Sequence, residues 1–275
     1  MSRTMRNLSW LIVALMTAVS AVGLALRESL YRDEAWILNA WFGNDVVTLF
    51  VAAPLLAWAL IAAGRGSRRG ELVWYAMLGY VVYNYAYYLF GARMNEFFPA
   101  YVALLVLPAV SLAVLLHRAD VAGIARCFSP RMPARGVAVY LGLTGIGLLF
   151  AWLAQWAAFV FAGTVPAVGE EPFKLIASLD LTFVVPLCLV AAVLLWRRSE
   201  WGYVFGTIMC MKSATYTLVL TAGTTTAVLR GVEGVAGQIP VWGVWTLAGA
   251  AATAIMLRGV VSHADASRAV AAESS

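Results

Sequence analysis

Apolar runs of about 18–22 residues, each long enough to cross a hydrocarbon core of roughly 30 Å as an α-helix, recur along the whole chain. Short polar segments separate the runs. The pattern predicts eight membrane-spanning helices, at about 8–26, 45–64, 71–90, 98–116, 137–161, 177–196, 202–222 and 240–257. The predicted fold class is therefore an all-α integral membrane protein with about eight transmembrane helices.

The composition supports a membrane protein and argues against a soluble one. Hydrophobic residues make up 63% of the chain, charged residues only 12%, and the mean hydropathy is +0.83. A soluble globular domain carries roughly 25% charged residues. We therefore expect the lipid bilayer to be the chain's main surrounding.

The positions of the arginines predict how the helices are oriented. Alternate polar segments are rich in Arg, whereas the segments between them are mixed or acidic, as in "VGEEPFK" and "RGVEG". Because Lys and Arg are retained on the cytoplasmic side, both termini should be cytoplasmic, and we expect the plasma (inner) membrane as the location. The net charge of +5 then reflects topology, and nucleic acid is not an expected partner.

The first apolar run has a second interpretation. It follows a basic start and ends in small residues, as a signal peptide does. Its length of about 19 residues exceeds the usual 7–15 of a signal-peptide core, which favours a retained helix. Cleavage would leave seven spans and an outside N-terminus.

Two segments of the chain are similar to each other. "APLLAWALIAAGRGSRRGELVWY" can be aligned with "VPLCLVAAVLLWRRSEWGY", which places Pro54 on Pro186 and, after a four-residue loop difference, Asn84 on Lys212. Helices 1–4 and 5–8 would start on the same side, so the prediction is two parallel four-helix repeats. Any two apolar hairpins with an Arg-rich turn would show some of this similarity. The predicted parts are a first half at 1–118, a cytoplasmic linker at 119–136, a second half at 137–258 and a flexible cytoplasmic tail at 259–275.

Lys212 is a charged residue inside an otherwise apolar predicted span, and its position there needs an explanation. It lies ten residues into its predicted span, about 15 Å from the inner boundary at 1.5 Å per residue. An ionisable residue at such a depth is costly and commonly marks a functional site. Helical spacing places it on one face with Thr215 and Tyr216, and a second polar face is predicted in the third span. That second face holds Tyr80, Tyr83, Asn84 and Tyr87. Tyr88, which aligns with Tyr216, is also a candidate site residue.

These faces predict a ligand-binding site in the interior of the bundle. Lys212 would hold an anionic group, while Asn84 and the tyrosines would supply hydrogen bonds and stacking. Asp45 and Asp180 each open a predicted span from the outer side, and Asp180 would balance the charge of Lys212. In the purely structural interpretation, Lys212 joins two helices through a carboxylate or carbonyls and binds no ligand.

The cysteines and histidines of the chain give little support to a redox, haem or metal site. The three cysteines, at 127, 188 and 210, have no CxxC spacing, and the two histidines, at 117 and 263, lie outside the predicted spans. A haem held by paired imidazoles and a His-rich metal site in the membrane are therefore excluded. We expect no cofactor and no metal.

The function predicted from sequence is a carrier or binding protein for a small polar or amphiphilic ligand that enters from the outer face. A membrane-embedded, lipid-modifying enzyme is an alternative, because outer-side carboxylates could bind a divalent metal. A second alternative is a non-catalytic subunit whose polar groups bind another membrane protein. A pocket at Lys212 would favour the carrier, clustered carboxylates the enzyme and a sealed bundle the subunit.

Overall fold

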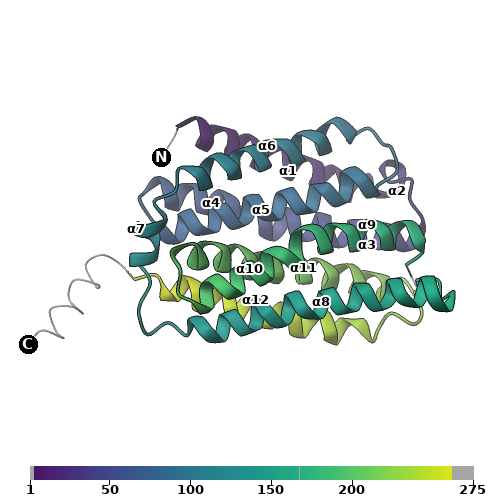
Figure 1. Ribbon diagram of the computed structural model, residues 1–275. Coiled ribbons are helices and arrows are strands. Elements are labelled where there is room, and N and C mark those ends of the chain that lie inside the picture. The colour runs from purple at the N-terminus through teal and green to yellow at the C-terminus, as the bar shows by residue number, and fades with distance from the viewer. Residues whose placement is uncertain (1–2, 167, 262–275) are drawn as a thin grey trace, which may run out of the picture. The chain divides into compact units, whose positions relative to one another are not determined.

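The computed structural model describes residues 3–166 and 168–261, and the elements it defines there are helices (Figure 1). One isolated bridge joins Phe128 and Val260. The last helix, α12 (Gln238–Gly259), ends where the predicted tail at 259–275 begins, and most of that tail lies outside the described residues. The fold is all-α, as predicted.

Seven helical segments in the described part of the chain are long and apolar enough to cross a membrane. In lipid, a helix satisfies its own backbone hydrogen bonds, which explains why such runs fold this way. These findings support a multi-pass helical membrane protein. The seven segments are Arg3–Ala25, Ile37–Gly64, Phe98–His117, Ala134–Ala162, Glu170–Trp196, Glu200–Leu229 and Gln238–Gly259.

The predicted third span corresponds to helix α5 (Arg68–Gly91), which is 24 residues long but is not among those seven. Its sequence contains two arginines, a glutamate and many tyrosines, so it is less apolar than its neighbours. Most of its side chains are nevertheless buried, including Tyr80 and Asn84. Polar groups that face protein instead of lipid explain how such a helix fits an apolar bundle.

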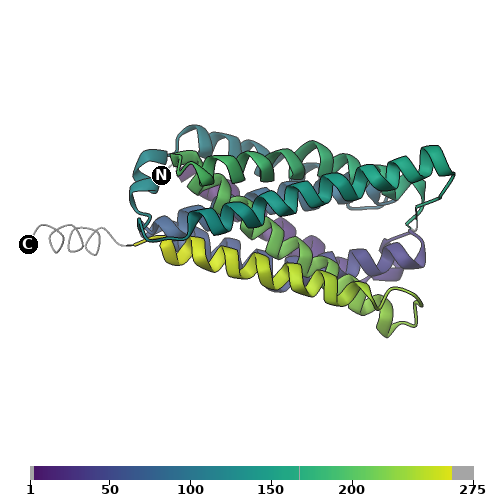
Figure 2. The ribbon, with the colours of Figure 1, turned by 60° about the horizontal axis from the view of Figure 1, so that its bottom comes forward.

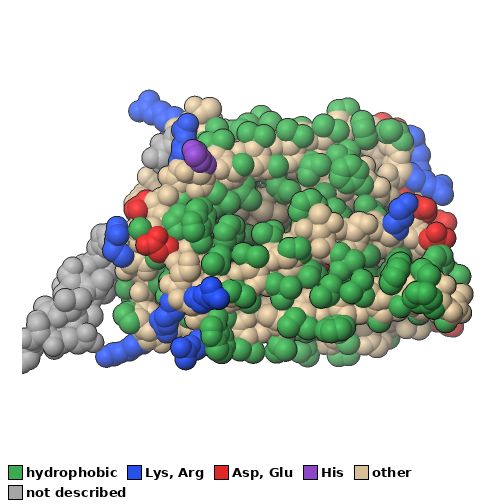
Figure 3. Space-filling model, viewed as in Figure 1, with side chains coloured by type: hydrophobic (Ala, Val, Ile, Leu, Met, Phe, Trp, Pro, Cys, Tyr) green, Lys and Arg blue, Asp and Glu red, His purple; other side chains and the backbone are tan. Residues whose placement is uncertain are grey.

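Charged side chains gather near the helix ends. Figure 3 shows hydrophobic side chains along the lengths of the helices on one face, with Lys, Arg, Asp and Glu toward the ends. Many of the hydrophobic side chains are exposed, such as Phe50, Phe150 and Leu247. Large exposed apolar surfaces are what a lipid-facing helix requires.

The residue contacts group the chain into two compact units. Unit 1 comprises residues 1–119 and 210–253, and unit 2 comprises residues 120–209 and 254–275. The division falls inside α11 (Glu200–Leu229) and α12, so it is drawn differently from the predicted halves. The predicted halves stay a prediction.

In unit 1, α5 packs against α4 (Ala53–Gly64) and α6 (Phe98–His117), and α1 (Arg3–Ala25) packs against α3 (Ala35–Val47), α4 and α6. These helices run side by side in Figures 1 and 2. A short helix α2 (Arg27–Leu30) joins α1 to the segment before α3. The part of α11 in unit 1 lies close to α3. A Cβ at Gly43 on α3 would be 2.6 Å from the carbonyl oxygen of Val219 on α11.

In unit 2, α8 (Ala134–Ala162) packs along α10 (Val185–Trp196), which continues α9 (Glu170–Leu179). The predicted linker at 119–136 contains a short helix α7 (Val121–Arg126). Beyond α7, the linker is fixed to the unit: the Arg198 guanidinium donates to the carbonyls of Pro130 and Met132, and Phe128 stacks on Tyr203.

Both α4 and α10 are preceded by one turn of π-helix, at η1 (Thr48–Ala52) and η2 (Asp180–Val184). In each case a proline, Pro54 or Pro186, is the second residue of the following α-helix. Proline has no N–H and clashes with the carbonyl four residues earlier, so the regular ladder cannot continue through it. The wider π-turn adjusts the helix at this point. The two π-turns begin at residues 48 and 180, which are 132 positions apart.

The turns that follow these helices also correspond at the same spacing. The amide of Ser67 donates to the carbonyl of Ala62 at 3.0 Å, and that of Ser199 donates to Leu194 at 2.9 Å. The residue before each serine, Gly66 or Arg198, has positive φ, as in a helix-terminating motif. Because both turns have one length, the four-residue loop difference of the sequence alignment is not needed here.

Candidate functional site

Lys212 lies on α11 in the part that belongs to unit 1, and its side chain is 8% exposed. Its ammonium is 3.7 Å from the ring centre of Tyr83 on α5 and 4.8 Å from that of Tyr216, one helical turn along α11. The two rings meet edge to face, with centres 4.7 Å apart. The predicted faces of the two helices therefore meet through these three residues.

This arrangement is a cation–π clamp, which we name the Lys212 clamp (Lys212, Tyr83, Tyr216). The negative faces of aromatic rings attract an ammonium, and the attraction reaches about 2 kcal/mol when the cation is shielded from water. A charge in the middle of a bilayer costs more than that, about 2.5–3.5 kcal/mol even on the milder scales. The two rings therefore offset a large part of the cost of burying Lys212.

One helical turn from the clamp, α5 forms a hydrogen-bonded ladder with η1. The Tyr80 hydroxyl lies 2.9 Å from Thr48 Oγ1, and Asn84 Nδ2 donates to the same oxygen at 3.4 Å. All three residues are completely buried. The side-chain oxygen of Asn84 has no hydrogen-bond partner among the described residues. A buried amide oxygen in this state can accept a bond from a water or a ligand.

Asp45 lies on α3, nearly one turn before Thr48, and is 1% exposed. Its two oxygens accept hydrogen bonds from the hydroxyls of Tyr31, at 2.7 Å, and Tyr88, at 2.9 Å. Burial, followed by the charge of Asp45, raises the pKa of the Tyr31 phenol far above its usual range. Tyr31 therefore stays protonated and remains a donor to this carboxyl group.

Two of the predicted site residues take up other interactions. The Tyr87 ring packs on Trp41, with centres 4.9 Å apart, and Tyr88 also stacks on Trp41 at 4.6 Å. The hydroxyl of Thr215 donates to the carbonyl of Met211 in its own helix. Tyr87 thus belongs to an aromatic layer, and Thr215 lies beside the clamp with its hydroxyl turned to the helix backbone.

Asp180 belongs to unit 2, where it is the first residue of η2. It is 6% exposed and accepts a hydrogen bond from Trp152 Nε1 at 3.0 Å. The structure thus gathers the predicted residues of α3, α5 and α11 within unit 1, and Asp180 is described with the other unit. Its predicted charge balance with Lys212 remains a prediction.

Sequence reasoning missed three residues of this region: Tyr31, Trp41 and Thr48. Thr48 had a usable signal, because it follows Asp45 by three positions and precedes Pro54 in the same apolar run. Tyr31 had none, since it lies in the polar segment between two runs. Its contact with Asp45 depends on how that segment folds back over the helices.

The carboxylates expected for the enzyme alternative are not gathered. In residues 3–166 and 168–261, no group of three or more His, Cys, Asp or Glu side chains is placed to hold a metal ion. Asp33, two residues before α3 begins, is instead used structurally and accepts hydrogen bonds from Trp41 Nε1 and the Arg93 amide. Glu96 pairs with Arg32.

Unit 2 also contains a groove of about 440 Å³ between α8 and α9. Its walls are mostly apolar and aromatic, with Trp152, Trp156 and Phe173 among them, and Lys174 is the basic residue among the described residues that line it. None of the residues predicted for the ligand site lines it. We therefore keep this groove separate from the candidate site.

Comparison of the chain with models of protein families, with curated proteins and with solved structures found no match.

Proposed function

We propose that the protein is a carrier or binding protein of the plasma membrane for a small polar or amphiphilic ligand that bears an anionic group. The ligand would enter from the outer face, and its anionic group would bind to Lys212. The interior of unit 1 supplies the remaining contacts. In this proposal α5 also crosses the membrane, which brings the number of spans to eight, and both termini are cytoplasmic.

The buried Lys212 ammonium against the Tyr83 ring is the observation on which the proposal rests. Aromatic rings stabilise a buried ammonium and leave it able to attract an anion, so an anionic ligand placed beside Lys212 would be stabilised further. A purely structural joint between α5 and α11 would be made at lower cost by apolar side chains. A buried cation beside aromatic rings and hydrogen-bonding groups is the set of contacts that an anionic ligand with polar groups would use.

The ladder beside the clamp supports a ligand that also has hydrogen-bonding groups. Asn84 directly follows Tyr83 in the sequence, and its buried oxygen accepts no bond from the described protein atoms. A ligand with a donor near its anionic group could use this oxygen. Such ligands include amino acids, hydroxy acids and the polar ends of lipids.

The repeated features support a chain built from two related four-helix halves. The π-turns, prolines and serine turns all correspond at a spacing of 132 residues. At that spacing Tyr80, and not Asn84, is equivalent to Lys212, and Thr48 is equivalent to Asp180. We propose this ungapped register for the repeat.

Thermal unfolding of the purified protein in detergent tests the function. The parent is screened against carboxylates, phosphates, amino acids and anionic lipids, because a ligand that binds the native state raises its melting temperature. We expect at least one class with an anionic group to stabilise the parent. Lys212→Met, which keeps the length of the side chain and removes its charge, should lose that stabilisation.

The chain provides a matched control, because Lys174 is the only other lysine in the sequence. Lys174 is exposed in unit 2, so Lys174→Met removes the same charge without affecting the clamp. Every ligand shift should survive in this variant. A Lys212→Met protein that folds and keeps all ligand shifts of the parent would refute the binding role of Lys212.

A further inference from the structure

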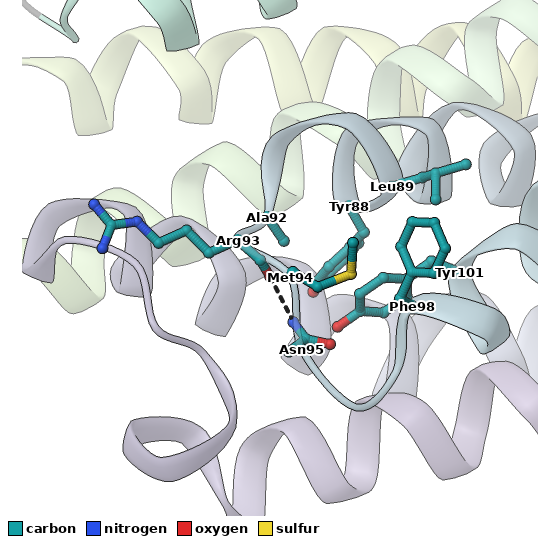
Figure 4. Close-up of a pocket in the computed structure, with 8 residues that line it drawn as sticks. All are labelled: Tyr88, Leu89, Ala92, Arg93, Met94, Asn95, Phe98 and Tyr101. Carbon is teal, nitrogen blue, oxygen red and sulfur yellow. Dashed lines mark hydrogen bonds between the residues drawn. The ribbon is translucent and has the colours of Figure 1, made fainter.

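A small cavity of about 60 Å³ lies at the loop between α5 and α6 (Figure 4). Arg93 and Asn95 from the loop, Tyr88 from α5 and Tyr101 from α6 are among the residues that line it. A water molecule needs roughly 10–15 Å³ of such space, so the cavity has room for several. Polar groups on its walls make it suitable for water.

Tyr101 gives the cavity a buried hydroxyl that has no hydrogen-bond partner among the described residues. The residue is 2% exposed, and its hydroxyl faces Asn95 and Tyr31 without a hydrogen bond of normal geometry to either. In Figure 4 the phenol end of Tyr101 points from α6 toward the loop at Asn95. A water in the cavity can bridge such groups, which direct contact does not join.

Tyr88 connects the cavity to Asp45. It lines the cavity, and its hydroxyl donates to Asp45 Oδ1 at 2.9 Å. The other oxygen of Asp45 accepts from Tyr31. One phenol group therefore separates a space that can hold water from a carboxyl group that is 1% exposed.

The titratable groups around Asp45 are mainly phenols. Tyr31 precedes α3, and the electrostatic effect of Asp45 also reaches Tyr80, Tyr85 and Tyr88 on α5 and Tyr101 on α6. On α1, Gly23 lies against Asp45 and has no side chain. The part of α11 in unit 1, which packs against α3, carries Cys210, Lys212 and Tyr216.

We propose that Asp45 is a proton-binding site that exchanges protons with the α5–α6 side of the membrane through this cavity. A hydronium ion in the cavity gives a proton to the Tyr88 oxygen, and the original hydroxyl proton of Tyr88 moves to Asp45 Oδ1. The products are water, an unchanged tyrosine and a neutral Asp45. Release follows the same steps in reverse.

Proton binding at Asp45 would give the carrier a coupling ion. Asp45 and Thr48 lie on neighbouring turns, and Thr48 bonds to Asn84 beside the Lys212 clamp. The charge of Asp45 can therefore change the site at which the ligand is proposed to bind. This coupling rests on the proposed function, whereas proton exchange at Asp45 does not.

Infrared spectroscopy of the ligand-free parent in lipid tests the exchange directly. Lowering the pH should produce the carbonyl stretch of a protonated carboxyl group, and this band should be missing in Asp45→Asn. Transfer to D₂O should shift the band as deuterium replaces the proton. Because no ligand is added, the result does not depend on whether the protein is a carrier.

Tyr88→Phe should slow the deuterium exchange by about tenfold, the effect of losing one hydrogen bond from the relay. Tyr101→Phe, which leaves the Tyr88–Asp45 bond in place, should also slow the deuterium exchange. It serves as the test if Tyr88→Phe does not fold. The matched control is Tyr75→Phe. Tyr75 is also on α5 and donates to a carboxylate, Glu71, but it lies outside the cavity.

Three results would overturn the proposal. The first is an Asp45 carboxylate that stays ionised down to the lowest pH at which the protein is folded. The second is a band that responds to sodium at constant pH, which would make the site one for a metal cation. The third is an exchange rate that Tyr88→Phe and Tyr101→Phe leave equal to that of Tyr75→Phe.

Discussion

Gly70 and Gly202 lie 132 residues apart and make the same kind of contact. A Cβ on Gly70 would lie 2.6 Å from the Ala62 Cβ, and one on Gly202 would lie 2.5 Å from the carbonyl carbon of Leu194. Ala62 and Leu194 are themselves 132 residues apart. Each glycine allows the helix that follows the turn to lie against the helix that precedes it.

We predict that Gly70→Ala and Gly202→Ala both destabilise the protein, because no atom can approach a backbone so closely. Overpacking of this kind costs about 1–3 kcal/mol. Gly147, in α8, has no atom within 4 Å of a built Cβ, so Gly147→Ala should be neutral or stabilising by up to about 1 kcal/mol. Melting temperatures in one detergent measure all three. Large losses at only one of the first two would argue against equivalent halves.

The hydrophobic pattern predicted the long helices closely, but it did not predict the first turns of α3 and α9. The run at 98–116 became α6 (Phe98–His117), and the run at 137–161 became α8 (Ala134–Ala162). The helices α3 and α9, however, begin well before their predicted spans at 45 and 177. Polar residues such as Asn39 and Glu170 interrupt the apolar pattern there, although the backbone stays helical.

The candidate site was predictable in composition but not in its contacts. The helical spacing predicted both polar faces, and Lys212 is buried as its place in an apolar run suggests. The contact between Lys212 and Tyr83 depends on how α5 and α11 pack, which no pattern along one chain specifies. The π-turn also escaped prediction: Pro54 indicated a disturbed helix, but not how the backbone would accommodate it.

The Lys212 clamp makes a prediction about Tyr83. Tyr83→Phe keeps the ring face and should leave stability close to that of the parent, whereas Tyr83→Leu removes the face. Loss of a shielded cation–π contact should cost about 1–2 kcal/mol, in addition to any loss of packing. Repeating both substitutions in Lys212→Met separates the two effects, since packing losses persist without the ammonium. An equal cost of Tyr83→Leu in both backgrounds would show that the clamp contributes nothing.

Gly23 on α1 packs directly against Asp45, and a substitution there tests how much space the Tyr31–Asp45 hydrogen bond needs. A Cβ at this position would clash with Asp45 Oδ2 and with the Tyr31 hydroxyl oxygen and would push them apart. Gly23→Ala should therefore weaken the Tyr31–Asp45 bond and lower the melting temperature, by about 1–3 kcal/mol in stability. Tyr31→Phe in the same background should then cost less than it does in the parent. Additive effects of the two substitutions would mean that Gly23 acts elsewhere.

Membrane topology is tested by reporter fusions. Fusions after about residues 67, 125, 199 and 268 should report the cytoplasm, and those near 95, 168 and 233 the outside, because the Arg-rich segments stay inside. The fusions at 67 and 95 bracket α5 and decide whether this tyrosine-rich helix crosses the membrane. The same side for both would remove α5 from the spans and reverse every later segment.

Substitutions at Lys212 and Asp180 test whether Lys212 has a structural role or binds a ligand. If Lys212 serves a ligand, Lys212→Met should insert, purify and melt like the parent or at a higher temperature, because a buried charge is removed. If the two residues neutralise each other, the single substitution leaves a buried carboxylate and destabilises the protein by about 3–5 kcal/mol. Asp180→Asn should then restore part of the loss, and a double-mutant cycle would give their coupling. Lys174→Met controls for loss of a lysine outside the site.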